Sequence, residues 1–298
     1  MGAHNVPAAR GIVRRNKWLL LRRFVQFSIL GLFMSGPFLG VWILKGNLAS
    51  STFLGEIPFT DPFIALQSVV AGHELAAPAI TGVALMLTLY LLIGGRSFCA
   101  WVCPINPVTD AAASLRNTLG IKANVRLSRY LRHGLVLVVI LVSYLMHDIA
   151  FEAVNPITLL HRGILFGMGV GWIAILAVFL FDLFVAKHGW CGHICPVGAF
   201  YGFINRFSLT RVSARDRASC TDCGDCFRVC PEPQVISPAL YPREAHASPI
   251  IASSDCITCG RCIDVCDPGV FNFTHRFDKT IGTRSVERVN SVSKDIAL

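Results

Sequence analysis

The chain has 298 residues, of which 53% are hydrophobic and only 15% are charged, and its mean hydropathy is +0.56. Soluble domains carry roughly 25% charged residues. This composition excludes an ordinary soluble enzyme, and the chain is too apolar to be disordered. The net charge of +9 is compatible with nucleic-acid binding. The basic residues are concentrated in alternate loops, however, so membrane topology explains the charge and no nucleic-acid partner is predicted.

Four apolar runs predict four transmembrane helices, because each is near the ~20 residues that cross a ~30 Å hydrocarbon core. The runs are Phe24–Leu44, Ala79–Gly95, Gly134–Phe151 and Ile164–Ala186. The first is interpreted as a retained anchor, since it is too long for a cleavable signal sequence and no small-residue cleavage site follows it. The alternative, buried helices of a soluble core, is disfavoured because all four runs lack Lys and Arg.

The basic residues alternate between successive loops. Segments 1–23 and 96–133 each hold six Lys or Arg residues, whereas segments 45–62 and 152–163 hold one each. The positive-inside rule then places both termini and segment 96–133 in the cytoplasm. All 12 cysteines fall on that side, in a reducing compartment where structural disulfides are disfavoured.

Two four-cysteine motifs near the C-terminus predict two [4Fe–4S] clusters. They read CTDCGDCFRVCP at 220–231 and CITCGRCIDVCDP at 256–268. Three thiolates at three-residue spacing wrap around one cubane, and the fourth cysteine reaches the other cubane. The predicted ligands are Cys220, Cys223, Cys226 and Cys266 for the first cluster and Cys256, Cys259, Cys262 and Cys230 for the second. Zinc is the alternative for one Cys-x2-Cys pair, but two complete motifs do not fit a zinc ribbon.

Two further cysteine pairs follow the second and fourth apolar runs, each ending in Cys-Pro. They are Cys99-x3-Cys103-Pro104 and Cys191-x3-Cys195-Pro196, so the chain looks like a duplicated pair of helices. On a helix this spacing places both thiols on one face, and the proline bends or ends that helix. The four thiols are open to three interpretations: an additional metal centre, a redox-active or partner-docking surface, or small buried residues. A redox role is slightly favoured.

Polar residues near the ends of the apolar runs are candidates for a quinol site, which needs a proton acceptor beside an apolar slot. The candidates are His73, Glu74, His147, Asp148, Asp182, His188 and His193. The alternative for each is a position in interfacial water. Arg22 and Arg23 are expected to anchor the first helix at the lipid headgroups. An aromatic belt is expected from Trp18, Trp42, Trp101 and Trp190.

Together these patterns predict a polytopic α-helical membrane protein, with four transmembrane helices in a duplicated hairpin and a C-terminal bacterial-type 2[4Fe–4S] ferredoxin domain. The predicted segments are a basic cytoplasmic N-terminus at 1–23, a membrane domain at 24–210, a ferredoxin-like domain at 211–277 and a mobile tail at 278–298.

Four stretches strengthen this interpretation through a resemblance: WLLLRRFVQF at 18–27, SGPFLGVWILKGN at 35–47, FCAWVCPINPVTD at 98–110 and HGWCGHICPVGAFYG at 188–202. With the ferredoxin motifs they closely resemble the NapH/MauN family across roughly residues 17–275. The resemblance implies a multi-pass quinol dehydrogenase subunit of the bacterial inner membrane. Its electrons would pass, with an iron–sulfur partner protein and a membrane multihaem cytochrome, to a periplasmic nitrate reductase that performs the nitrate chemistry.

Two other functions remain open. A cytoplasmic-face membrane ferredoxin would serve the assembly of another respiratory enzyme, or reduce its metal or thiols. A docking scaffold would carry clusters that are mainly structural. The predicted topology also puts the clusters inside and the acceptor outside, so electrons would have to cross by quinone, partner haems or an additional centre.

Overall fold

The computed structural model describes residues 15–121, 125, 127–167, 169, 171–241 and 248–278. The predicted N-terminal segment up to residue 14 and the tail after residue 278 lie outside this part. The helices are α2 (Lys17–Leu39), α3 (Pro62–Val70), α4 (Ala77–Ile93), α5 (Ser97–Trp101), α6 (Ile105–Thr118), α7 (Tyr130–Met146), α8 (Pro156–Phe166), α9 (Gly171–Leu180), α10 (Pro196–Asn205), α11 (Asp225–Val229), α12 (Ser237–Leu240) and α13 (Arg261–Val265). The strands are β1 (Leu44–Gly46), β2 (Ser50–Phe53), β3 (Ile57–Thr60), β4 (Thr210–Ala214) and β5 (Phe271–His275).

Four apolar helices, α2, α4, α7 and α9, lie within or across the four predicted runs. Among the described residues one helix, α2, is long and apolar enough to cross a membrane by itself. The other three are shorter apolar helices, with α9 extended to Val185 by one π-helical turn. The prediction of four spans is therefore not confirmed by helix length and stays a prediction.

The predicted helix boundaries are wrong at two places. The first run was expected to stay helical to Leu44, but α2 ends at Leu39 because Gly40 adopts a left-handed conformation (φ 72°) and the chain continues into β1. The fourth run was expected to be one helix, but α8 ends at Phe166 and α9 starts at Gly171. Gly167 lies in this break with a φ value of 98°. A residue with positive φ commonly ends an α-helix.

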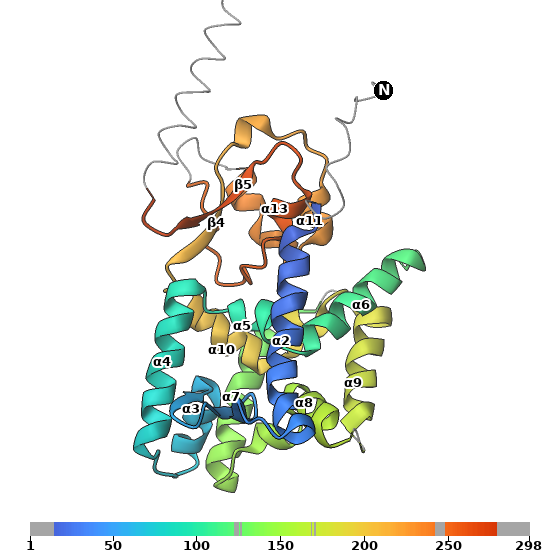
Figure 1. Ribbon diagram of the computed structural model, residues 1–298. Coiled ribbons are helices and arrows are strands. Elements are labelled where there is room, and N and C mark those ends of the chain that lie inside the picture. Colours follow the sequence, from blue (N-terminus) through green and yellow to red (C-terminus); the bar gives the residue numbers. More distant parts are fainter. Residues whose placement is uncertain are drawn as a thin grey trace, which may run out of the picture.

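A small antiparallel sheet, in the order β1-β2-β3, fills the connection between α2 and α4. Asp61 follows β3 and is the N-cap of α3, where its carboxylate accepts hydrogen bonds from the amides of Phe63 (2.7 Å) and Ile64 (3.1 Å). These interactions satisfy two amides that the helix itself cannot. The sheet and α3 lie at the end of the molecule opposite to β4 and β5 (Figure 1).

The C-terminal part contains the antiparallel pair β4–β5, with Thr210 opposite His275 and Ala214 opposite Phe271. Beside it lie the short helices α11 and α13, one from each four-cysteine motif (Figure 1). Gly224 and Gly260 precede these helices with φ values of 73° and 72°. Only glycine adopts this conformation without a Cβ penalty, so the glycine after the second cysteine of each motif allows the turn into its helix.

The N-terminus of α2 is attached to this C-terminal part. Asp264 of α13 accepts hydrogen bonds from the amides of Trp18 (2.9 Å) and Leu19 (3.1 Å), whereas Asn16, the N-cap residue, makes no side-chain cap. The Trp18 ring packs edge-on against Phe273, with ring centroids 4.8 Å apart. Trp101 donates its indole N–H to the carbonyl of Thr258 (3.2 Å).

Two expectations about the membrane surface are therefore wrong. Trp18 and Trp101 pack between protein segments instead of forming a belt, whereas Trp42 is 54% exposed and a belt position of Trp42 and Trp190 stays a prediction. Arg22, expected at the headgroups, is 2% exposed and donates to Ala100 O (3.0 Å) and Asn106 Oδ1 (2.6 Å). Arg23 pairs with Asp110 of α6. The reason is that the first half of α2 runs along α5 and α6, so its polar side chains find protein partners.

A buried ion-pair network joins the helical part to the C-terminal part. Arg96, just before α5, is 1% exposed and donates to Glu232 Oε1 (3.3 Å), Asp255 O (2.7 Å) and Cys191 O (3.2 Å). Arg132 of α7 donates to the same Glu232 oxygen (3.3 Å) and pairs with Asp255. Glu232 follows Cys230 by two residues and Asp255 precedes Cys256. The network therefore fixes both four-cysteine motifs against α5 and α7.

Replacing Arg96 by Met should lower the free energy of unfolding by about 3–5 kcal/mol, because it leaves buried Glu232 and Asp255 with one cation between them. The matched control is Arg228→Met, which removes an exposed pair with Asp225 and should cost less than about 1 kcal/mol. The thermal unfolding midpoints of the purified proteins in one detergent measure both effects. Equal midpoints for the two variants would contradict the structural role of the network.

Candidate functional site

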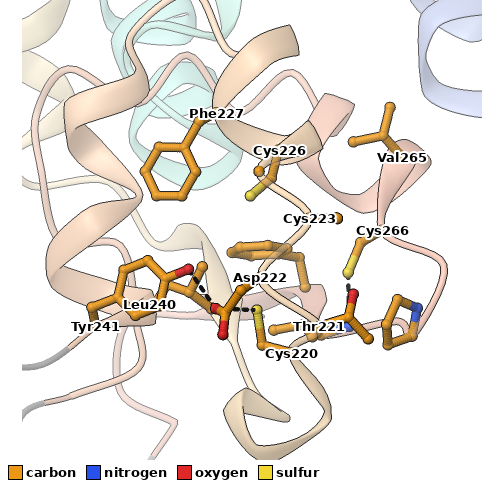
Figure 2. Close-up of a pocket in the computed structure, with 14 residues that line it drawn as sticks. Cys220, Thr221, Asp222, Cys223, Cys226, Phe227, Leu240, Tyr241, Val265 and Cys266 are labelled. Carbon is orange, nitrogen blue, oxygen red and sulfur yellow. Dashed lines mark hydrogen bonds between the residues drawn. The ribbon is translucent and has the colours of Figure 1, made fainter. Parts of the chain in front are cut away.

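The first predicted ligand set lies around one cavity. Cys220, Cys223, Cys226 and Cys266 all line it, together with Leu240, Val270 and other apolar residues. Figure 2 shows Cys220 and Cys226 on one segment of the chain and Cys266 approaching from another. The second motif therefore supplies Cys266 to the site that the first motif builds. Cys223 is exposed, so this cavity is close to the molecular surface.

The second predicted set is also brought together, deeper in the protein. Burial raises the pKa of Cys262, and the neighbouring thiols Cys259, Cys256 and Cys230 raise it further. Cys259 and Cys262 are buried, and Cys256 and Cys230 are partly buried. Here the first motif supplies Cys230 to the site of the second motif. Each group is thus three cysteines from one motif and one from the other.

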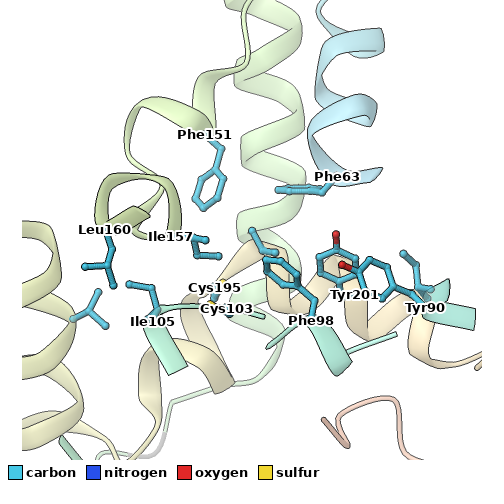
Figure 3. Close-up of a cluster of buried hydrophobic side chains, with 13 residues drawn as sticks. Phe63, Tyr90, Phe98, Cys103, Ile105, Phe151, Ile157, Leu160, Cys195 and Tyr201 are labelled. Carbon is cyan, nitrogen blue, oxygen red and sulfur yellow. The ribbon is translucent and has the colours of Figure 1, made fainter. Parts of the chain in front are cut away.

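The four remaining cysteines form a third group, although they are far apart in sequence. Burial raises the pKa of Cys191, and Cys195, Cys103 and Cys99 are near enough to raise it further. Cys103 and Cys195 lie close together, within a cluster of buried side chains that includes Phe98 and Ile157 (Figure 3). Cys103 and Cys195 are buried and Cys99 and Cys191 are partly buried, so the choice between a redox role and a docking surface stays a prediction.

The local structure of these motifs differs from the predicted single helix. Cys99 lies in α5 and Cys191 in a π-helical turn, Trp190–Ile194, whereas Cys103 and Cys195 lie beyond the ends of those segments. Pro104 and Pro196 then begin the next helices, α6 and α10, as N-cap and first residue. Proline suits these places because it has no amide hydrogen to satisfy there.

The environment of the third group keeps free thiols in their neutral form. Burial raises the pKa of Cys195 to about 12, so without a cation this thiol is protonated at neutral pH. Metal binding deprotonates such thiols. Burial also raises the pKa of Cys99, but the guanidinium of Arg96 opposes that shift. Within the described ranges, no three His, Cys, Asp or Glu side chains are close enough to hold a single metal ion.

The polar residues predicted for a quinol site do not gather in one place. His73 and Glu74 are exposed, and His147 and Asp148 cap the turn after α7. The other three lie near the third cysteine group: Asp182 accepts from the Trp190 amide (2.9 Å), His188 is 3.9 Å from Asp110, and His193 lies in the π-helical turn of Cys191.

Three polar residues of the interior are not indicated by the sequence pattern: Arg96 and His161, which are buried, and Asp61, which is half-buried. The positive-inside rule uses Arg96 only as one of the six basic residues of segment 96–133. The Asp61-Pro62 pair is a helix-start signal, but the hydrogen bond of Asp61 with Tyr201 joins residues that are 140 positions apart. Both ring nitrogens of His161 are buried and lack a hydrogen-bond partner in the described part of the chain.

Comparisons with known proteins agree with the cysteine geometry. A family model described as a 4Fe-4S dicluster domain matches residues 213–267, and one described as a 4Fe-4S binding domain matches residues 75–122 and 164–215. The second model thus covers both Cys-x3-Cys-Pro motifs. No solved structure matches the chain.

Three relatives are similar over nearly their whole length. The methylamine utilization ferredoxin-type protein MauN of Methylorubrum extorquens is 51% identical over 269 residues, which are 90% of this chain and 93% of the relative. The ferredoxin-type protein NapH is 46% identical in Escherichia coli, over 90% of this chain and 93% of the relative. The NapH protein of Haemophilus influenzae is also 46% identical, over 92% of this chain and 98% of the relative. The chain therefore belongs to the NapH/MauN family of ferredoxin-type iron–sulfur electron-transfer proteins.

Proposed function

We propose that this chain is a membrane subunit that takes electrons from quinol and relays them through iron–sulfur clusters to a partner. The observation that carries the proposal is the continuity of the three cysteine groups. Cys226 of the first group is near Cys262 of the second. Cys259 of the second lies in one buried cluster with Ala100, against which Cys99 of the third group packs. Electron carriers at these three places would connect the protein surface at Cys223 with the helical part.

The ligands proposed for the first two carriers are the predicted sets. Cys220, Cys223, Cys226 and Cys266 would hold one [4Fe–4S] cluster, and Cys256, Cys259, Cys262 and Cys230 would hold the other. Each set provides the four thiolates that a cubane requires, from two motifs that exchange their fourth cysteine. When bound, each cluster supplies one-electron redox chemistry. The chain holds the clusters in apolar surroundings, which tune their potentials.

The third group, Cys99, Cys103, Cys191 and Cys195, is proposed to hold an additional iron–sulfur centre. Three observations support this: the thiols converge, they are largely buried, and Arg96 faces Cys99 with a positive charge. A thiolate-bound cluster is anionic, so a buried guanidinium beside it is favourable.

Iron and acid-labile sulfide contents test the ligand assignment. Protein isolated without oxygen should hold about eight of each for two cubanes, and about twelve if the third group holds another cubane. Cys223→Ala should lose about four of each, whereas Cys191→Ala should lose iron only if the third centre exists. An iron-free, colourless wild-type protein would contradict the whole proposal.

The four apolar helices are proposed to span the membrane together. Their outward side chains support this, since large apolar residues are widely exposed on them, including Phe24, Phe27, Leu137 and Leu145 at 62–70%. Apolar faces of this extent need lipid or a partner. The positive-inside rule then puts the clusters on the cytoplasmic face of the inner membrane.

Reduction of the clusters by a short-chain quinol tests the donor. In anaerobic membranes, quinol should produce the electron paramagnetic resonance signal of reduced clusters, and dithionite should give the full signal as the control. If quinol leaves the clusters oxidised while dithionite reduces them, the quinol role fails. Transfer of electrons to a metal ion or protein thiol in the same assay would instead favour the assembly function.

The terminal acceptor is proposed to be a periplasmic nitrate reductase, reached through an iron–sulfur partner protein and a membrane multihaem cytochrome. A second candidate is a methylamine-oxidising system, because relatives named for methylamine utilization are 51% identical, at least as similar as those named NapH. Deletion of the gene should abolish quinol-dependent periplasmic nitrate reduction and leave growth on methylamine intact. The reverse result would select the second candidate.

A further inference from the structure

A large apolar pocket of about 490 Å³ opens between α2, α4 and the β1–β3 sheet. Leu89, at its mouth, is 41% exposed on the outer face of α4, whereas Phe33, Tyr90 and Phe98, in its wall, are at most 4% exposed. The pocket thus leads from the lipid-facing side of the helices to the interior. Its volume is in the range of pockets that hold drug-sized ligands.

A carboxylate borders the apolar wall of this pocket. Asp61 lines the pocket and accepts a hydrogen bond from the hydroxyl of Tyr201 (2.7 Å). Burial raises the pKa of Asp61, the Tyr201 hydroxyl and the two α3 amides lower it, and the charge of Glu152 raises it. Asp61 is therefore a carboxylate that can both accept and release a proton inside an apolar site.

Asp61 also borders a second, much smaller cavity on its other side. Asn155 and Thr158 line that cavity, and Asn155 donates a hydrogen bond to Glu152 (3.4 Å). Glu152 is only partly buried, so it connects this side with solvent. Asp61 thus borders both the apolar pocket and a small cavity that leads toward Asn155 and Glu152.

The same pocket lies next to the segment that carries Cys99 of the third cysteine group. Phe98 and Trp101 line it, and Cys99 lies between these two residues in α5. Phe98 stacks on Tyr201 with ring centroids 5.2 Å apart, and Tyr201 meets the Tyr90 ring edge-on at 4.9 Å (Figure 3). A molecule in the pocket would contact Phe98, which belongs to the same cluster of buried side chains as Tyr201, Cys103 and Cys195.

We propose that this pocket binds the head group of a quinol, with its isoprenoid tail leaving past Leu89, and that Asp61 is the proton acceptor. This rests on the proposed quinol-oxidising function. Quinol loses two electrons and two protons. One quinol O–H bond breaks and its proton forms an O–H bond on Asp61, which passes it toward Asn155 and Glu152. The restored carboxylate takes the second proton, while two oxidised iron–sulfur clusters accept one electron each.

Asp61→Asn tests the proton acceptor. Asn remains a good N-cap for α3, so the fold should persist, but it cannot take a proton. Reduction of the clusters by quinol should slow by about 100-fold, the usual scale for a lost general base, while the dithionite-reduced signal is unchanged. The control Glu56→Gln removes an exposed carboxylate of the same sheet and should match the wild type. An unchanged rate in Asp61→Asn would overturn the assignment.

The pH dependence gives a second readout for this variant. Asp61 must be ionised to accept a proton, so the wild-type rate should fall as the pH falls through its raised pKa, at higher pH than for an ordinary Asp. The groups that face it are Tyr201, Tyr90 and Glu152. The acidic fall should disappear in Asp61→Asn, and its persistence would assign the proton acceptor to another residue.

Photolabelling locates the head group without using cluster reduction. An azidoquinone should label peptides from 25–33 and 84–102. Leu89→Trp, which fills the mouth, should reduce this labelling, whereas Leu91→Trp on the opposite side of α4, 38% exposed, should not. If quinol reduces wild-type clusters but labelling lies elsewhere, the site is wrong and the function stands. If quinol reduces no clusters, the function fails even where the pocket is labelled.

Discussion

The hydrogen bonds of the buried Arg96 guanidinium are the interaction on which the arrangement of the cysteine groups depends. Arg96 lies three residues before Cys99 and contacts Glu232, the backbone of Asp255 and the backbone of Cys191. One side chain therefore contacts residues in or beside three of the four cysteine motifs and itself precedes the fourth. Arginine suits this place because its planar group donates several hydrogen bonds in fixed directions while staying charged. A buried pair of this kind adds specificity of placement more than stability.

The sequence predicted the groups whose geometry is set by local spacing. The ferredoxin intervals anticipated that Cys266 would approach Cys220 and that Cys230 would approach Cys256, and the structure brings these residues together. The apolar runs also anticipated the cores of α2, α4, α7 and α9. In both cases the prediction depends on short sequence signals: the fixed spacing of cysteines, or a continuous run of apolar residues.

Features that depend on distant contacts could not be predicted. Arg22 looks like a headgroup anchor until α5 and α6 are placed beside it, and Asp61 looks like an ordinary helix cap until Tyr201 reaches it from another segment. The break between α8 and α9 was hidden because its glycines lie inside an apolar run. Composition measures how apolar a segment is, and the path of its backbone depends on conformations that composition does not encode.

The cap of α2 by Asp264 has a consequence for biogenesis. The Trp18 amide and its acceptor are 246 residues apart in the chain. At translation speeds of about 5–20 residues per second, the first helix waits roughly 10–50 s for this partner. The ribosome thus completes the two C-terminal four-cysteine motifs and Asp264 long after the first helix has been made. Before the chain is complete, the cysteine sets are not yet assembled. Insertion of the iron–sulfur clusters is therefore expected to follow release of the polypeptide from the ribosome.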